Sequence, residues 1–405
     1  MSESLMAELF RKQAAKMGYE NSEAQEDVGY LTGFLNFDYL NGYINTQKVN
    51  GELQDYFTLG ITDGSYVCFI GNAGTGKTTL VTQIAANIAR QYKTTTIFED
   101  NTEAGLTTAR RRSLSLFSEQ EYKERYIVRN SGITIENFYD RINEIYKLKI
   151  ENREKFMYDT GKNDLYGNPI MKLEPTIYIL DSIANIMPKD IDEADELAGK
   201  SAGAAAAQAM SRALKQILQK LKAANIILLA TNHIKEDVQM TMFPKKAALP
   251  GLKQGERIPK GRDAVYLANN IIRLDHVEKL NEDKTYKLEG SVVEVSLVKS
   301  RTSGKKKGTR LVYDFSNGFD PWLSLLEYLR NNKLLFGSST FMALDPDKKF
   351  VFTNSNFREK LQEEEFRNAF MRTVIADLKT IPNRPILAQN LHTDDLLSNP
   401  SLFSL

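Results

Sequence analysis

The sequence predicts an α/β fold in which a mostly parallel sheet is flanked by helices and followed by a small α+β domain. Two observations lead to this prediction. A short apolar run, residues 65–70, enters the glycine-rich segment 71–79, and an apolar stretch with helical spacing, residues 80–89, follows it. A second apolar run, residues 176–182, contains Asp181 near its end, and apolar runs alternate with amphipathic stretches beyond it.

Composition and charge restrict the function classes that fit this chain. Of 405 residues, 42% are hydrophobic and 26% are charged, as in ordinary globular proteins. The formal net charge is +1, so any binding of nucleic acid must come from local basic segments. The single cysteine, Cys68, excludes a disulfide framework, and three histidines argue against a zinc site. We expect a cytoplasmic protein without membrane contact, because no apolar run approaches membrane-spanning length and the N-terminus does not resemble a secretion signal.

Residues 1–28 predict a polar, amphipathic helical arm at the N-terminus. Two interpretations remain equally open: a frayed terminus, or an arm that packs on a neighbouring subunit. Residues 43–64 then predict a polar connection, which ends at the turn signal Asp63-Gly64 before the first strand of the core.

The glycine-rich segment, which we call the phosphate loop, fits the pattern G-x-x-x-x-G-K-[ST] in its required strand–loop–helix context. Its glycines let backbone N–H groups surround phosphate oxygens at a helix N-terminus. Lys77 would contact the β- and γ-phosphates, and the Thr78 hydroxyl would bind Mg²⁺. The lysine, the hydroxyl and both flanks disfavour a chance glycine-rich turn. The loop consists of Gly71, Asn72, Ala73, Gly74, Thr75, Gly76, Lys77, Thr78 and Thr79.

The elements after the loop follow from apolar periodicity, in the order strand, helix, strand, helix. A polar excursion interrupts them at residues 150–174. We expect strands at residues 94–98, 126–128, 176–182, 226–231, 271–274, 292–298 and 311–315. We expect helices at residues 106–116, 133–148 and 203–224.

Polar residues stand at the ends of three of these strands, where open α/β sheets bind their ligands. The strand at 94–98 runs into the acidic segment 99–103, and the strand at 176–182 reaches Asp181. An Asp in that position can act on the Mg²⁺ coordination sphere, although a helix N-cap would use the same residue. Asn232 and His233 follow the strand at 226–231 and are either site residues or an ordinary turn.

Three charged segments are candidates for binding phosphate groups. Residues 187–203 form an acidic loop that also contains Lys189 and Lys200, and residues 299–310 form a hairpin tip that contains no acid. Residues 234–263 form a basic loop of unusual length, and such loops are often functional. A solvated loop remains the alternative for the long segment, and a solubility device for the hairpin tip. The basic residues of the long loop are Lys235, Lys245, Lys246, Lys253, Arg257, Lys260 and Arg262.

Residues 322–405 differ in character from the preceding chain and predict a small C-terminal domain. We expect helices at residues 322–329 and 357–378 and a short strand at 350–352. The chain thus divides into a helical arm at 1–28, an ATPase core at 29–321 and a C-terminal domain with a tail at 322–405.

The order of these elements resembles the RecA-like recombinases and is closest to the phage UvsX group. The resemblance spans roughly residues 30–380 and extends beyond the glycine loop. The glycine loop and the Asp strand are shared by many ATPases, and the late segments make the resemblance specific. The segments that carry the resemblance are Thr32-Gly33 with Asp38-Tyr39-Leu40-Asn41-Gly42, Glu103-Ala104-Gly105-Leu106-Thr107, Leu180-Asp181-Ser182-Ile183-Ala184, Thr231-Asn232-His233, Val298-Lys299-Ser300-Arg301-Thr302, Gly318-Phe319-Asp320-Pro321 and Glu365-Phe366-Arg367-Asn368-Ala369.

The resemblance implies a RecA-like core and a role for each matching residue. Glu103 would activate the attacking water, Asp181 would act through Mg²⁺, and His233 would sense the γ-phosphate. Arg110 stands where the family often stacks an aromatic ring on adenine. Lys299 and Arg301 would reach the ATP of the adjacent protomer. The segments 187–203 and 234–263 would be the two DNA-binding loops.

The function implied by the resemblance is ATP-dependent DNA strand exchange for homologous recombination and repair, with ATP and Mg²⁺ as cofactors. The chain would form a head-to-tail helical filament on single-stranded DNA, pair it with double-stranded DNA, and work with single-strand-binding and loader proteins in a phage-infected bacterium. Two alternatives stay open: a hexameric replicative helicase with the same core, and a KaiC-like regulatory ATPase.

Overall fold

The computed structural model describes residues 12, 13, 16, 27–103, 105–192, 201–236, 251–281, 286, 288–301 and 307–382. The predicted arm at 1–28 lies almost entirely outside these residues, as does the tail beyond residue 382.

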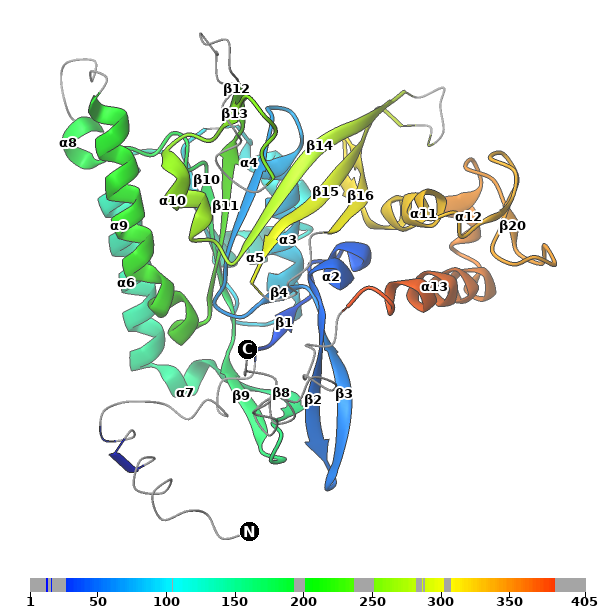
Figure 1. Cartoon of the computed structure of the whole chain (residues 1–405), viewed down its shortest axis with the longest axis horizontal. Helices are drawn as coiled ribbons and strands as arrows, with labels where there is room; N and C mark the ends of the chain where they lie inside the picture. The colour runs from blue at the N-terminus through cyan, green and yellow to red at the C-terminus, as the bar shows by residue number, and fades with distance from the viewer. Residues whose placement is uncertain are drawn as a thin grey trace, which may run out of the picture.

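A nine-stranded mixed sheet forms the centre of the molecule (Figure 1). Its order is β17-β16-β15-β14-β5-β11-β10-β6-β7. The strands from β14 to β7 are parallel, whereas β15, β16 and β17 extend the sheet antiparallel. Their bounds are β5 Tyr66–Gly71, β6 Ile97–Asn101, β7 Tyr126–Arg129, β10 Thr176–Asp181, β11 Ile226–His233, β14 Asn270–Leu280, β15 Gly290–Ser300, β16 Lys307–Asp314 and β17 Gly318–Asp320.

Helices cover both faces of this sheet. Successive strand residues point to opposite faces, and both sets are apolar, so both faces must be buried. Val67 packs in the core beneath α3 and α5, while its neighbour Cys68 packs in the core beneath α6, α9 and α10. The prediction of an α/β fold is therefore confirmed, with a mixed sheet. The helix bounds are α3 Lys77–Gln91, α4 Thr108–Ser115, α5 Glu119–Arg125, α6 Ile135–Glu151, α9 Ser201–Ala224 and α10 Gly261–Tyr266.

The polar connection expected at residues 43–64 is wrong, because this segment contains strands. β2 (Tyr43–Val49) and β3 (Glu52–Thr58) form an antiparallel hairpin, and β4 (Ile61–Thr62) pairs with β1 (Gly29–Tyr30). The signal was the dipeptide Asn50-Gly51, whose φ angles of 51° and 87° suit a two-residue hairpin turn.

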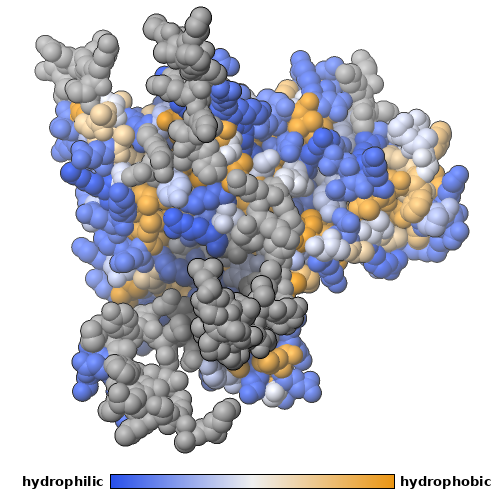
Figure 2. Space-filling view, in the orientation of Figure 1, coloured by the Kyte–Doolittle hydropathy of each residue, from blue (hydrophilic) through white to orange (hydrophobic). Residues whose placement is uncertain are grey.

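The excursion at 150–174 also folds into a hairpin, after the short helix α7 (Arg153–Phe156). β8 (Met157–Asn163) pairs with β9 (Pro169–Leu173). Asp164 O accepts a hydrogen bond from the Lys48 amide at 3.0 Å, and Asn163 Nδ2 donates to Lys48 O at 3.1 Å. We call these two joined hairpins, residues 43–58 and 157–173, the lobe. It projects from one end of the sheet in Figure 1, and an apolar patch is visible there in Figure 2.

The C-terminal region is built of helices around a three-stranded sheet. Its phenylalanines, among them Phe357, Phe366 and Phe370, share a core with Tyr39 and Val312 of the preceding chain. The single helix expected at 357–378 is wrong, because two helices occupy this segment. The elements are α11 Pro321–Asn331, β18 Phe336–Gly337, β19 Met342–Ala343, β20 Val351–Phe352, α12 Phe357–Lys360 and α13 Glu364–Leu378. The three-domain division stays a prediction.

Four short elements complete the described chain: α2 Leu35–Asn41, α8 Lys189–Asp192, β12 Lys235–Glu236 and β13 Glu256–Arg257. Within the described ranges, none of the helices combines the length and the hydropathy that crossing a membrane requires.

Candidate functional site

The phosphate loop joins β5 to α3 at the carboxyl end of the parallel strands. Asn72, Ala73 and Gly74 are exposed along its outer side, whereas Lys77 is 5% exposed. Lys77 Nζ donates to Gly71 O at 3.0 Å and to Asn72 O at 2.9 Å. Burial lowers the pKa of Lys77 to about 8, although Glu103 and Asp181 oppose this shift. The lysine is thus a buried cation held inside the loop that would receive phosphate.

The shape of the loop requires glycine at two positions. Gly74 and Gly76 have φ angles of 79° and 81°. A Cβ atom on Gly76 would lie 2.9 Å from the ring of Phe319 and 3.0 Å from that of Tyr313. These two rings stack on each other with centroids 4.6 Å apart and pack against the start of α3, which leaves no space for a side chain at Gly76.

Asp181 connects the loop to the adjacent strands. Its Oδ2 accepts a hydrogen bond from Thr78 Oγ1 at 2.8 Å, and its Oδ1 accepts one from Thr231 Oγ1. Burial raises the pKa of Asp181, and the hydrogen bonds from Thr231 and Thr78 counteract that rise. Thr231 was not predicted as a site residue. Strand pairing would have identified it, because Ala230 lies opposite Leu180 and the next residues are therefore neighbours.

This pair of oxygen donors fits Mg²⁺. Mg²⁺ prefers oxygen ligands and is usually held by one or two carboxylates together with substrate phosphates and water. Thr78 Oγ1 and Asp181 Oδ2, from the two residues predicted to hold the metal, lie 2.8 Å apart at the mouth of the loop. In the described ranges, no group of three or more His, Cys, Asp or Glu side chains is placed to hold a metal ion. Phosphate oxygens would therefore have to complete the coordination.

Glu103, Ser182 and His233 meet beside this pair. Glu103 Oε1 lies 2.5 Å from His233 Nε2 and accepts a hydrogen bond of 2.5 Å from Ser182 Oγ. The side chains of Glu103 and His233 remain 23% and 24% exposed. The structure therefore brings Lys77, Thr78, Glu103, Asp181 and His233 together. The predictions did not include Ser182 among the site residues, although it directly follows Asp181.

Arg110 contacts main-chain carbonyl groups of the turn after β16. Its guanidinium donates to Phe315 O at 3.0 Å and to Ser316 O. Its neighbour Arg111, which was not predicted, forms a buried ion pair with Glu99 at 2.7 Å. The Tyr126 hydroxyl donates to the same carboxylate at 2.7 Å. Glu99 is thus structural, and α4 is fixed to both β6 and the turn by consecutive arginines.

Lys299 and Arg301 lie at the opposite end of the sheet from the phosphate loop of the same chain. Lys299 is opposite Ile271, which is itself opposite Cys68 in β5, and the Arg301 amide donates to Asn269 O. Asn269 forms hydrogen bonds with the backbone of Tyr66, the first residue of β5. At about 3.3 Å per residue, Tyr66 lies about 17 Å from Gly71, where the phosphate loop begins. These two cations therefore do not join the phosphate site of their own chain.

Lys299 is nevertheless held in a defined position. Its Nζ donates to Ala268 O at 2.8 Å and to Tyr266 O, and it lies 4.5 Å from the centre of the Tyr266 ring. Burial, and secondarily the charge of Arg301, lowers the pKa of Lys299 to about 8.

The two predicted DNA-binding loops begin at the phosphate-loop end of the sheet, where α8, β12 and β13 lie (Figure 1). Lys235, Lys253 and Arg257 have exposed side chains, and Lys189 begins α8. Lys260 is half-buried, and its Nζ lies 2.8 Å from Met187 Sδ. This contact connects the end of the 234–263 segment to the start of the 187–203 segment. Lys200, Lys245 and Lys246 lie outside the described residues, as does the side chain of Arg262.

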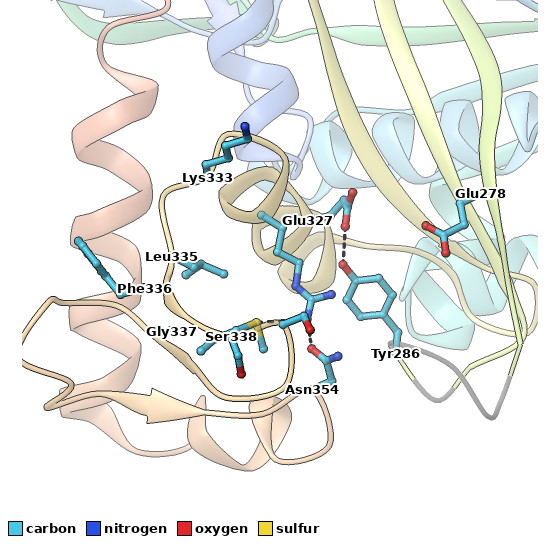
Figure 3. Close-up of a pocket in the computed structure, with 12 residues that line it drawn as sticks. Glu278, Tyr286, Glu327, Lys333, Leu335, Phe336, Gly337, Ser338 and Asn354 are labelled. Atoms are coloured by element: carbon cyan, nitrogen blue, oxygen red, sulfur yellow. Dashed lines mark hydrogen bonds between the residues drawn. The ribbon is translucent and has the colours of Figure 1, made fainter.

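A separate cavity of about 560 Å³ lies between the end of β14 and the C-terminal region (Figure 3). Arg330 and Glu327 form part of its wall. Arg330 donates to Asn354, and Glu327 accepts a hydrogen bond of 2.6 Å from Tyr286. These groups satisfy one another, and none of the predicted site residues lines the cavity.

A scan against models of known protein families gave no match to this chain, and a search among curated proteins also gave none.

Proposed function

We propose that this chain is an ATP-dependent DNA strand-exchange recombinase with a RecA-like core, which forms helical filaments on single-stranded DNA. The observation that carries the proposal is the set of contacts made by Asp181, Glu103 and Lys77 around the phosphate loop. Many P-loop ATPases share such a set. The segments at 298–302, 318–321 and 365–369, by their resemblance to the UvsX group, favour a recombinase.

The phosphate loop would bind ATP through its backbone N–H groups, through Lys77 and through the N-terminus of α3. Lys77 Nζ now donates to two loop carbonyls, so it would transfer its hydrogen bonds to the incoming phosphates. Thr78 and Asp181 would hold Mg²⁺, which neutralises charge that develops on the phosphates. Asp181 must be ionised for this role, although burial raises its pKa.

Glu103 would accept a proton from the attacking water while Ser182 and His233 hold its carboxylate in place. His233 ends β11 and is followed by Ile234, whose amide donates to Gly71 O at 3.1 Å. A γ-phosphate near His233 would therefore influence the segment that leads into the 234–263 loop. This arrangement supports a link between hydrolysis and DNA binding.

Lys299 and Arg301 would complete the site of the adjacent protomer. Their location at the far end of the sheet supports this assignment, because a head-to-tail contact places that end against the next phosphate loop. Such a contact that does not close on itself produces a helical filament. Basic residues of the two loops would then contact DNA phosphates, so binding would weaken strongly as salt increases.

Strand exchange is the direct test of the proposal. Purified chain, circular single-stranded DNA and homologous linear duplex should give joint molecules with ATP and Mg²⁺, and none without ATP. A heterologous duplex provides the control for base pairing. Absence of joint molecules under all salt conditions, in a preparation that hydrolyses ATP, would contradict a recombinase.

Two further measurements address the alternatives. Electron microscopy with single-stranded DNA and a non-hydrolysable ATP analogue should show filaments, whereas closed rings alone would support a hexameric helicase. Failure to bind single-stranded DNA at low salt in the presence of ATP would support a regulatory ATPase of the KaiC type.

A further inference from the structure

Arg273, in β14, occupies the junction between the phosphate loop and the base of the long 234–263 loop. It is 4% exposed, and it lies opposite Ile70, which immediately precedes the phosphate loop. The next residue, Leu274, is opposite Gly71, and its carbonyl oxygen would be 2.6 Å from a Cβ atom on that glycine. The backbone of β14 thus packs tightly against the start of the phosphate loop.

The guanidinium of Arg273 contacts Asp275 in its own strand and two groups in the segment 251–257. It donates to both carboxylate oxygens of Glu256, at 2.6 and 2.9 Å, and to both of Asp275, at 2.6 and 2.9 Å. A further bond of 2.6 Å reaches Gly251 O. Glu256 begins β13 and also accepts a hydrogen bond of 2.6 Å from the Lys253 amide. Arg273 therefore fixes the described returning end of the loop, residues 251–257, to the central sheet.

The outgoing end of the same loop is fixed to the phosphate loop itself. Gly71 O accepts hydrogen bonds from the Ile234 amide, at 3.1 Å, and from Lys77 Nζ, at 3.0 Å. Beyond Ile234, Lys235 in β12 pairs with Arg257 in β13, so the two ends are joined to each other. Gly71 O is therefore shared by Lys77, which would leave it to bind phosphate, and by Ile234, which leads into the 234–263 loop.

We propose that Arg273 is a positioning residue that transmits the state of the phosphate loop to the base of the 234–263 loop and so couples DNA binding to ATP hydrolysis. This inference rests on the proposed function. When Lys77 moves from Gly71 O to phosphate, the β5 end and the β12–β13 pair change their mutual position. Arg273 makes that change common to both ends of the loop, because its bidentate bonds resist independent movement of β13.

The charges around Arg273 are consistent with a fixed connection rather than a mobile one. The hydrogen bonds that the Arg273 guanidinium donates to Glu256 lower the pKa of this carboxyl group, so it stays ionised at neutral pH. Lys253 Nζ lies 3.8 Å from Asp275, so each carboxylate of the cluster faces a cation. A lysine at position 273 would retain the charge but could not bond to both carboxylates and Gly251 at once.

The test compares ATP hydrolysis with and without single-stranded DNA for the whole chain, Arg273→Met and Arg273→Lys. Arg273→Met should hydrolyse ATP without DNA at a rate within about twofold of the unaltered chain and lose about tenfold or more of its stimulation by DNA, in the range usual for coupled sites. Arg273→Lys should be intermediate. Arg125→Met, which removes the hydrogen bond to Thr95 O at 3.0 Å, is the arginine control and should keep full stimulation.

The double variant Arg273→Met/Glu256→Gln distinguishes a positioning role from a purely structural one. It removes the Glu256 charge that Arg273→Met leaves unpaired, and it should therefore recover thermal stability. We expect stimulation to stay low in this variant. Recovery of stimulation together with stability, or normal stimulation of Arg273→Met itself, would overturn the inference. If the unaltered chain showed no stimulation by single-stranded DNA, the proposed function would fail instead, so the two failures are distinguishable.

Discussion

The two ends of the central sheet are built in different ways. At the phosphate-loop end, the site side chains lie at strand ends and at the start of α3. Asp181 at the end of β10 contacts Thr231 in the adjacent strand β11 and Thr78 in the first turn of α3. At the opposite end, the buried carboxylate of Asp63 binds Lys172 at 3.0 Å and Lys222 at 2.9 Å. Those two lysines come from the lobe and from the last turn of α9.

The difference separates a reactive end from an anchored end. Lys77 donates to two loop carbonyls, which it can exchange for phosphate. The lobe-end lysine Lys149 donates to three fixed oxygens, Glu174 O, Thr176 Oγ1 and Asn225 O, at 2.7 to 3.2 Å. We infer that the anchored end provides a rigid platform, from which Lys299 and Arg301 would be presented to the next protomer.

The largest effect is expected from Lys77→Ala at the reactive end. ATP hydrolysis should decrease by about 100-fold or more, because a preorganised charge on the transferred phosphoryl group is lost. Lys172→Ala is the matched lysine control and should hydrolyse ATP within about twofold of the unaltered chain, because Lys222 still binds Asp63 in this variant and Lys299 and Arg301 are intact. Phosphate release measures both, and equal losses would remove the distinction between the two ends.

Glu103→Gln should reduce turnover by about 100-fold while ATP still binds, because glutamine keeps the shape and hydrogen bonding of the side chain but cannot accept the proton. Titration with a fluorescent ATP analogue would verify binding, and single-turnover hydrolysis would measure the chemical step. Turnover at the level of the unaltered chain would show that another group activates the water.

The affinity for ATP should depend on pH through Lys77. Its pKa in the free chain is about 8, and a bound phosphate would raise that value, so binding takes up a proton when the pH exceeds about 8. Affinity should therefore be constant below pH 7 and fall about tenfold between pH 7 and pH 9. Calorimetric titration across this range measures the dependence. Lys172→Ala should show the same curve, and a constant affinity up to pH 9 would contradict the buried cation.

The smallest effect is expected from Asn163→Ala in the lobe, which removes the hydrogen bond to Lys48 O. The free energy of unfolding should decrease by about 1 kcal/mol, the usual net value of one hydrogen bond. Denaturant unfolding would measure this change, and ATP affinity should be unaltered. A marked loss of ATP affinity would show that the lobe influences the reactive end.

Sequence alone predicted most of the reactive end, because its determinants are local. A glycine loop needs a strand before it and a helix after it, and strand ends in a parallel sheet converge. Thr231 and Ser182 were missed although they stand beside predicted residues. The contacts that anchor the opposite end were not predicted, because several of them join segments more than 100 residues apart, such as Lys48 with Asn163 and Asp63 with Lys222. No local pattern indicates that two polar hairpins will pack on each other.

The turn at Asn50-Gly51 is an exception, because it was visible in the sequence as a hairpin signal and was overlooked. Arg273 illustrates the opposite case. A lone arginine in an apolar strand predicts nothing by itself, and only the arrangement of β13 and β14 reveals its three partners.

The claim that one complete site needs opposite ends of two chains is tested most directly by mixing two inactive variants. Lys77→Ala lacks a working phosphate loop, and Lys299→Ala/Arg301→Ala lacks the cations of the anchored end, so each alone should hydrolyse ATP poorly on single-stranded DNA. In an equal mixture, about a quarter of the head-to-tail contacts would combine one intact loop with one intact pair of cations, and hydrolysis should recover accordingly. A mixture as inactive as its components, or full activity of Lys299→Ala/Arg301→Ala alone, would contradict the account.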